Sequence, residues 1–446
     1  MKKILIFPFL FFLLLNPNSL FGHFNSYAEE GSNKILIKLK PRFDSTSSKI
    51  SLKRSIPGLA RAKKILSLKE TGIQILDFSP GEDIDSLISD LKSNPYVQYA
   101  EKDFKMRFTG WIKKTNDPLF NQQWGLKNTG QVINGLGGDS SGLKGASIKI
   151  TKAWRISRGK KKIVVAFIDS GIDFTHPDLQ KNIWVNKGEI PGNGEDDDGN
   201  GYIDDINGWD FVNNDNIPDD EIEFFPHGTN GAGIIAATTN NNEGIAGINW
   251  NVSLIVLKIS PSLAEAVQAI EYAVKNGARI INASFGENIS SDSMKDAISA
   301  AGEKGILFVA AADDSSYDND TIPFYPASYE LPNILSVTAT NKNDELADFA
   351  SFGKNSIDIA APGDDIITTS SPGLTGESYQ YVQGTSFATN FVTGVAALAL
   401  AEKPFIKIAK LKKIILLNTD KLESLKDRTV TGGRLNAFKV LKAINN

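Results

Sequence analysis

The chain has 446 residues, 41% hydrophobic and 22% charged, which is the balance of a soluble globular protein with room for two or three domains. It contains no cysteine, so disulfides, cysteine nucleophiles and thiolate metal sites are all excluded. Residues 1–115 carry a formal charge of +8 and residues 116–446 one of −12, so a basic segment precedes an acidic body.

The first residues have the pattern of an export signal. Lys2 and Lys3 precede an apolar run over residues 4–15, and the small residues that end at Ala28 suggest cleavage after it. A membrane anchor is the alternative, but a spanning helix needs about 20 apolar residues and this run is shorter. We therefore expect residues 1–28 to be a signal peptide and the product to be secreted, without a stable membrane anchor.

Residues 29–115 have the pattern of a small α+β domain. Residues 34–41, 72–78 and 96–100 predict strands, and the apolar spacing over residues 83–92 predicts a helix with one buried face. The positive charge of this segment would suit either a nucleic acid or the acidic remainder of the chain.

The acidic body begins with loop-like sequence over residues 108–150 and continues with alternating strands and helices. Apolar runs without polar alternation are typical of strands buried on both faces of a parallel sheet. The predicted strands cover residues 162–168, 253–257, 278–282, 305–311 and 334–339, and helices are predicted over 263–276 and 293–304. This alternation predicts an α/β fold, a doubly wound and mostly parallel sheet flanked by helices, with functional residues at the carboxyl ends of its strands.

Three polar residues stand at such positions. Ser386 precedes a helical stretch, where serine is either an N-cap or a nucleophile raised toward free backbone N–H groups. His227 is one of only three histidines in the chain, and it is framed by a proline and by small residues, as suits a general base. Asp169 follows the first long strand, from which it could orient an imidazole.

The joint pattern resembles the subtilisin-like serine proteases. The shared motifs, in that family's order, are Asp-Ser-Gly at 169–171, His-Gly-Thr at 227–229 and Gly-Thr-Ser at 384–386. The resemblance implies that Ser386 attacks a peptide carbonyl, that His227 transfers its proton, and that Asp169 holds His227. It further implies that Ser284, Phe285 and Gly286 form one wall of the pocket for the residue before the cut.

The resemblance also assigns the parts of the chain. It makes residues 116–446 a subtilisin-like peptidase domain and residues 29–115 an inhibitory prodomain of ferredoxin-like fold, removed by a cut between Phe104 and Asn116. The expected partners are protein or peptide substrates and the chain's own prodomain. We expect a monomer that uses no organic cofactor and does not bind nucleic acid.

Asp314 departs from the family pattern, because it occupies the place of an asparagine that donates a hydrogen bond to the oxyanion. An ionised carboxylate only accepts hydrogen bonds and repels negative charge. Either Asp314 is protonated and donates, or activity is low. The alternative function is therefore peptide binding without hydrolytic activity. A second alternative is nucleic-acid binding by the basic residues 1–115, here called the leader.

Acidic residues predict bound Ca²⁺ at two places. The run from Asp196 to Asp205 has oxygen ligands at the spacing of the first half of an EF-hand loop, but lacks its closing glutamate. The candidate ligands there are Asp196, Asp198, Asn200, Tyr202 and Asp205. The resemblance implies a second site formed by Asp178 and Asn241, with Asp117 as a possible third ligand.

Overall fold

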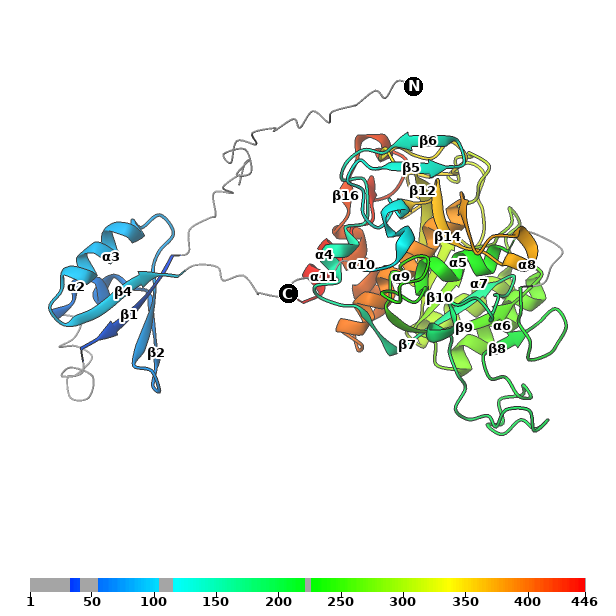
Figure 1. Cartoon of the computed structure of the whole chain (residues 1–446), viewed down its shortest axis with the longest axis horizontal. Helices are drawn as coiled ribbons and strands as arrows, with labels where there is room; N and C mark the ends of the chain where they lie inside the picture. The colour runs from blue at the N-terminus through cyan, green and yellow to red at the C-terminus, as the bar shows by residue number, and fades with distance from the viewer. Residues whose placement is uncertain (1–32, 41–54, 104–114, 221–225, 446) are drawn as a thin grey trace, which may run out of the picture. The chain divides into compact units, whose positions relative to one another are not determined.

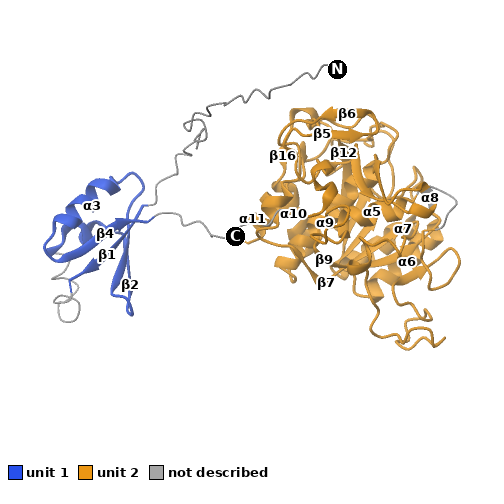
Figure 2. Ribbon diagram, viewed as in Figure 1, with its two compact units in different colours: residues 1–111 blue, residues 112–446 orange. Residues whose placement is uncertain are grey.

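The computed structural model describes residues 33–40, 55–103, 115–220 and 226–445 (Figure 1). The chain divides into two compact units, Met1–Trp111 and Ile112–Asn446, each with its own hydrophobic core (Figure 2). The expected signal peptide and residues 104–114 of the expected processing region lie outside the described residues. Within the described ranges, no helix is both long enough and apolar enough to cross a bilayer.

Within its described residues, the first unit is a four-stranded antiparallel sheet with two helices. Its elements are β1 (Lys34–Leu39), α2 (Pro57–Arg61), β2 (Lys64–Leu68), β3 (Ile73–Asp77), α3 (Ile84–Ser93) and β4 (Val97–Lys102). The strand order β2-β3-β1-β4 is the ferredoxin-like arrangement that the family resemblance implied. Asp83 caps α3 by accepting from the N–H of Ser86, and Leu87 and Leu91 of α3 are buried with Ile35 and Ile37 of β1.

The second unit is built on a nine-stranded sheet in the order β16-β17-β13-β12-β11-β10-β7-β9-β8. Its strands are β7 (Gly159–Asp169), β8 (Gly208–Asp210), β9 (Asn251–Lys258), β10 (Ile280–Ala283), β11 (Leu307–Ala311), β12 (Ile334–Thr340), β13 (Ile359–Pro362), β16 (Asp420–Lys421) and β17 (Gly433–Arg434). All adjacent pairs are parallel except β16–β17. The predicted doubly wound parallel sheet is therefore confirmed.

Helices cover both faces of this sheet, as alternate residues of β7 show. Val165 and Phe167 pack in one core cluster with α5 (His227–Ala236) and α9 (Thr385–Glu402). Ala166 and Ile168 pack in a second cluster with α6 (Leu263–Lys275) and α7 (Asp292–Glu303). Because the central strands are buried on both sides, their sequences have no polar alternation.

Smaller elements complete the second unit. They are η3 (Pro118–Gln122), α4 (Ile150–Ala153), η4 (Gln180–Asn182), α8 (Pro372–Thr375), α10 (Ile408–Leu417), η5 (Glu423–Leu425), α11 (Ala437–Ile444) and the antiparallel pairs β5 (Val132–Gly135) with β6 (Gly138–Ser141) and β14 (Ile366–Thr369) with β15 (Tyr379–Val382). The loop expected over residues 108–150 therefore contains a β-hairpin. The prediction missed it because its outer strand, Gly-Asp-Ser-Ser, is exposed throughout and carries no apolar residue.

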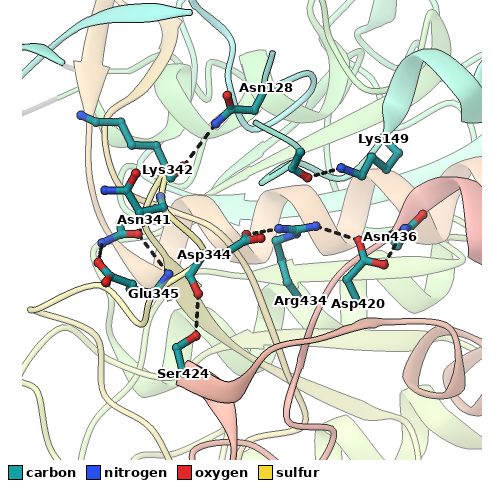
Figure 3. A network of polar contacts seen from close by, with 12 residues as sticks. Asn128, Lys149, Asn341, Lys342, Asp344, Glu345, Asp420, Ser424, Arg434 and Asn436 are labelled. Atoms are coloured by element: carbon teal, nitrogen blue, oxygen red, sulfur yellow. Dashed lines mark hydrogen bonds and ion pairs between the residues drawn. The ribbon is translucent and has the colours of Figure 1, made fainter. Parts of the chain in front are cut away.

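A buried arginine fastens the last strand to the body of the unit. Arg434 is 1% exposed and forms ion pairs with Asp344 and Asp420 (Figure 3). Asn436 donates to the same Asp420 carboxylate at 3.0 Å and caps α11 by accepting from Lys439 N. The network joins the loop after β12 to the segment that precedes α11, so the C-terminal helix has a fixed place in the core.

Candidate active site

Asp169 and His227 meet where β7 ends and α5 begins. Asp169 is the buried last residue of β7, and His227 is the first residue of α5. The His227 Nδ1 atom lies 2.6 Å from Asp169 Oδ1. An imidazole that donates from Nδ1 keeps its Nε2 lone pair free to accept a proton. The contact has the geometry that the sequence predicts for a base and its orienting carboxylate.

Carboxylates control the protonation of His227. Burial opposes protonation, but the charge and hydrogen bond of Asp169 outweigh it and raise the pKa of the imidazole. Asp220 and Asp314 add smaller effects in the same direction. A raised pKa makes His227 a stronger base and moves upward the pH at which the base becomes available.

Gly228 allows α5 to approach β7 closely enough for this contact. A Cβ at this residue would lie 1.9 Å from the carbonyl oxygen of Gly171, so any side chain would displace the backbone. The Gly228 N–H donates to Ser170 Oγ at 2.9 Å. The glycine of the His-Gly-Thr motif thus sets the position of His227 relative to Asp169.

Asp220 is a buried carboxylate that the sequence reasoning missed. Its Oδ1 accepts from Ser170 Oγ at 2.9 Å, and its Oδ2 accepts from Thr229 N at 3.1 Å. Burial raises the pKa of Asp220 to about 6. The carboxylate links the residue after Asp169 to the first turn of α5, where a helix favours negative charge. Its sequence signal is weak because it is one of several acids that precede His227.

Ser386 lies in the first turn of α9, beside the Asp169–His227 pair. The ring of the next residue, Phe387, has its centroid 5.3 Å from that of His227. The Ser386 hydroxyl donates to the carbonyl oxygen of Ser284 at 3.3 Å, and the Ser284 hydroxyl donates to the Ser386 carbonyl at 3.3 Å. The structure thus places the helix turn that carries the predicted nucleophile next to the ring of His227, while the Ser386 hydroxyl itself bonds to the predicted substrate-binding segment.

Asp314 follows β11 and interacts with the N-terminus of α9. Its Oδ1 accepts from Thr385 N at 2.7 Å. The side chain remains accessible to solvent, but the protein packed around it desolvates the carboxylate and raises its pKa. The adjacent Asp313 acts in the same direction, whereas His227 acts in the opposite one. Both the protonated and the ionised carboxyl group can keep the bond to Thr385, and only the protonated one can also donate.

The predicted pocket wall follows β10 and faces an aromatic ring. A Cβ at Gly286 would lie 2.4 Å from Cε1 of Phe324 and 2.4 Å from the carbonyl oxygen of Tyr325, so the ring of Phe324 packs directly on this glycine. Phe285 and Gly286 also line a cavity of about 400 Å³ with Leu263 and other largely apolar residues. Phe324 contacts the predicted pocket wall, although no sequence motif indicated it.

A sequence model described as the subtilase family matches residues 160–434. The chain belongs to the subtilase family. It is 30% identical over 379 residues to the thermophilic serine proteinase of Bacillus sp. strain AK1, a match that covers 83% of this chain and 78% of that protein. Thermitase of Thermoactinomyces vulgaris is 31% identical over 300 residues, which are 66% of this chain and 94% of thermitase.

A solved structure of a protease from Pseudoalteromonas arctica has the same fold. Its TM-score is 0.58 at 24% identity, and the match covers 74% of this chain and 99% of that one. The fold and the family together identify this subtilase as a serine-type endopeptidase.

The acidic run of the subtilase forms a compact carboxylate cluster. Ligand oxygens of Glu189, Asp198 and Asp205 lie within 4.8 Å of one another, and Glu189 and Asp205 are buried. Carboxylate oxygens are hard donors, and a group of three carboxylates is the kind of ligand set that Ca²⁺ prefers. Sequence reasoning missed Glu189 because it precedes the EF-hand-like run and belongs to no spacing pattern.

The other predicted ligands of this loop have different surroundings. The Asp196 carboxylate accepts from the N–H groups of Asn200 and Gly201 at 3.0 and 2.8 Å. The Asn200 amide donates to Asp205 at 2.8 Å, and its carbonyl accepts from Tyr202 N at 2.8 Å. These bonds fold the loop around the cluster, and the three-carboxylate group does not include Asp196.

The second predicted set also comes together. The Asn241 amide donates to Asp178 at 2.7 Å, and Asp117 accepts from the N–H groups of Asn240 and Asn241. Burial raises the pKa of Asp178 to about 6. His176, the remaining histidine here, accepts from Asp178 N and lies 2.9 Å from the carbonyl of Ser378, and burial lowers its pKa. This histidine is a neutral structural neighbour of Asp178.

Proposed function

We propose that this subtilase hydrolyses peptide bonds with Asp169, His227 and Ser386 as its catalytic residues. The observation that supports this best is the 2.6 Å contact between His227 and Asp169, beside the helix turn that carries Ser386. The substrates are extended segments of proteins or peptides, which pair with the backbone after β10 by β-augmentation.

The reaction proceeds through an acyl-enzyme. His227 Nε2 accepts the Ser386 hydroxyl proton as Ser386 Oγ attacks the scissile carbonyl, and Asp169 stabilises the imidazolium. The tetrahedral intermediate collapses when the protonated His227 gives its proton to the leaving amine. A water molecule, activated by the same imidazole, then hydrolyses the ester at Ser386 and restores the free hydroxyl group.

The oxyanion is stabilised at the N-terminus of α9. N–H groups in a first helical turn have no acceptor within the helix, so the Ser386 N–H is available to the developing charge. Asp314 supplies the second donor when it is protonated. Its raised pKa and its bond to Thr385, which occupies Oδ1, leave Oδ2 to carry that proton.

An active-site-directed fluorophosphonate tests this assignment. Labelling requires a serine activated by a working base, so we expect modification at Ser386 and its loss in the His227→Ala variant. The Ser315→Ala variant is a control, because it removes an exposed serine beside Asp314 and label at Ser386 should persist. Label that stays after Ser386→Ala would contradict the assignment.

A peptide-binding protein without hydrolytic activity is the second candidate, and the contact of Asp314 with Thr385 supports it. An ionised Asp314 would repel the oxyanion while leaving the binding of extended peptides intact. Peptide binding by the chain without label at Ser386 and without product would favour this alternative over the enzyme.

We also propose that residues 1–28 direct secretion and that residues 29–115 inhibit the peptidase until they are removed. The opposite charges of the leader and the body support the docking of one on the other. N-terminal sequencing of the secreted protein tests both steps. Retention of residues 29–115 by the Ser386→Ala variant alone would indicate self-processing, and their retention by the active protein would contradict it.

Calcium is the proposed metal. Glu189, Asp198 and Asp205 would hold one ion, and Asp117, Asp178 and Asn241 a second. Buried carboxylates that lack a neighbouring cation are costly, and a bound ion would neutralise them. The ions supply no step of the hydrolysis, since their role is to fix loops that would otherwise open to proteolysis.

A further inference from the structure

Cations gather at the amino-terminal edge of the large sheet. The basic face consists of Lys160, Lys161 and Lys162 at the start of β7 and Lys403, Lys407 and Lys410 around the start of α10. All six are exposed. Residues 158–163 and 401–411 hold seven Lys or Arg and one acid, Glu402, within a body whose charge is −12.

One hydrogen bond joins these two segments, although they are far apart in sequence, and a second ties the later segment to Arg279, just before β10. Lys160 Nζ donates to the carbonyl oxygen of Ala401 at 2.6 Å, which joins the start of β7 to the end of α9. Arg279 Nη1 donates to the carbonyl oxygen of Pro404 at 2.6 Å. Cations suit these places, because the carbonyl groups at a helix C-terminus lack partners and carry partial negative charge.

The charge of the basic face is not neutralised within the unit. Among the residues that the structure describes, none of its six lysines forms an ion pair. Elsewhere the same unit pairs even exposed lysines, such as Lys354 with Asp427 and Lys426 with Glu423. The basic face is thus a concentrated positive patch that an external anion can approach.

Phe405 projects from the middle of this patch. Its side chain is 97% exposed, the most exposed of the large hydrophobic residues in the described ranges. The bonds to Ala401 and Pro404 fix the backbone just before it. An aromatic side chain surrounded by lysines is typical of protein segments that lie at a membrane interface, where the ring enters the headgroup region and the ammonium groups reach the phosphates.

The basic face and the active site occupy opposite ends of the same strand. Lys160 stands at the beginning of β7 and Asp169 at its end. A flat surface that binds the basic face therefore leaves the active site pointing away from it. A flexible soluble polyanion long enough to pass beyond the patch would also be repelled by the net negative charge of the remainder of the unit.

We propose that the basic face docks the peptidase unit on a bilayer that contains anionic phospholipid. Lysines held close to such a surface each strengthen binding about fivefold, and the attraction is screened by salt. Phe405 adds an apolar contact that does not depend on salt. The proposal concerns placement and is independent of the catalytic assignment.

Co-sedimentation with vesicles tests the proposal. The chain should bind vesicles of phosphatidylcholine with phosphatidylglycerol at low salt, and should bind pure phosphatidylcholine vesicles much more weakly. The double variant Lys162→Glu/Lys407→Glu should lose at least about 25-fold in affinity. The matched control Lys144→Glu/Lys295→Glu makes the same change in net charge at exposed lysines outside the basic face, and it should retain binding.

Further arms identify the ligand. Phe405→Ser should weaken binding to anionic vesicles and leave any binding to soluble polyphosphate unchanged. Because the leader is the same in all variants, equal binding by the two double variants would place the contact elsewhere and overturn the proposal. Polyphosphate binding that matches vesicle binding and ignores Phe405 would identify a soluble polyanion as the ligand instead, and would overturn it as well.

Discussion

Replacement of Asp314 by asparagine is the most informative perturbation of this active site. Asparagine keeps a carbonyl oxygen for Thr385 N and places an amide donor where the Oδ2 atom of the carboxylate stands. In the wild-type chain that donor exists only while Asp314 is protonated, whereas in the variant it exists at every pH. Asp314→Asn should therefore raise turnover, and the gain should grow with pH.

The pH dependence follows from two opposed requirements. In the proposed mechanism, hydrolysis needs neutral His227, which is favoured above its raised pKa, and protonated Asp314, which is favoured below its own raised pKa. Because the rate is proportional to the product of these two populations, its pH profile is bell-shaped. The apparent pKa values of the two limbs belong to the coupled pair rather than to either residue. On the alkaline limb the wild type loses about tenfold per pH unit. The loss levels off at about 10²–10³-fold, which is the rate reduction caused by removal of one oxyanion-hole donor in a related subtilase.

The assay is kcat/KM against pH for a chromogenic peptide. Asp314→Asn should convert the bell into a single rising limb with a plateau, and Asp314→Ala should lower the whole profile. Asp313→Asn is the matched control, because it removes a neighbouring charge without adding a donor at the site. It should keep the bell and move its alkaline limb to lower pH, since Asp313 helps to raise the pKa of Asp314. If the Asp314→Asn variant had the same rate and the same profile as the wild type, the donor role of Asp314 would be refuted.

Three further changes probe the pocket, the base and the metal. Phe324→Gly should open space beside the pocket wall. The ratio of kcat/KM for a peptide with phenylalanine before the cut to that for a peptide with alanine there should rise at least tenfold. An unchanged ratio would show that Phe324 does not limit the size of the pocket. Asp220→Asn removes a negative charge that raises the pKa of His227, so the acidic limb of the profile should move to lower pH, whereas a purely structural role would lower activity without moving the limb. Calcium chelation should lower the melting temperature by about 5 °C or more if the ion was present at about a hundred times its Kd. Glu189→Gln should reduce the difference in melting temperature between the samples with and without chelator, whereas the exposed control Glu195→Gln should not. Equal melting temperatures of the wild type with and without chelator would exclude bound calcium.

The central strands could be predicted because their physical environment leaves a local trace in the sequence. Residues 162–168 and 305–311 are apolar without interruption since both faces of β7 and β11 are covered by helices. The hairpin of β5 and β6 left no such trace, because its outer strand is exposed. The edge strands β8 and β16, of three and two residues, are too short to have a pattern of their own.

The site could be predicted where chemistry is tied to a motif, and not where it depends on distant contacts. His227 and Gly228 are adjacent in sequence, and the contact of Gly228 with Gly171 explains why a glycine follows the histidine. Asp220, Phe324 and Glu189 act through residues brought near by the fold, so a single sequence holds no local sign of them. The roles of the predicted catalytic and calcium-binding residues themselves remain predictions that the experiments above address.

The length of β7 sets a reach for the enzyme. Its 11 residues, at about 3.3 Å each, separate the two ends of the strand by roughly 30 Å. An enzyme that rests on a bilayer by the basic face, at the start of β7, would cut its substrates roughly 30 Å above the lipid. Proteins whose vulnerable loops stand on stalks would then be cleaved, and those whose loops lie flat against the membrane would be spared.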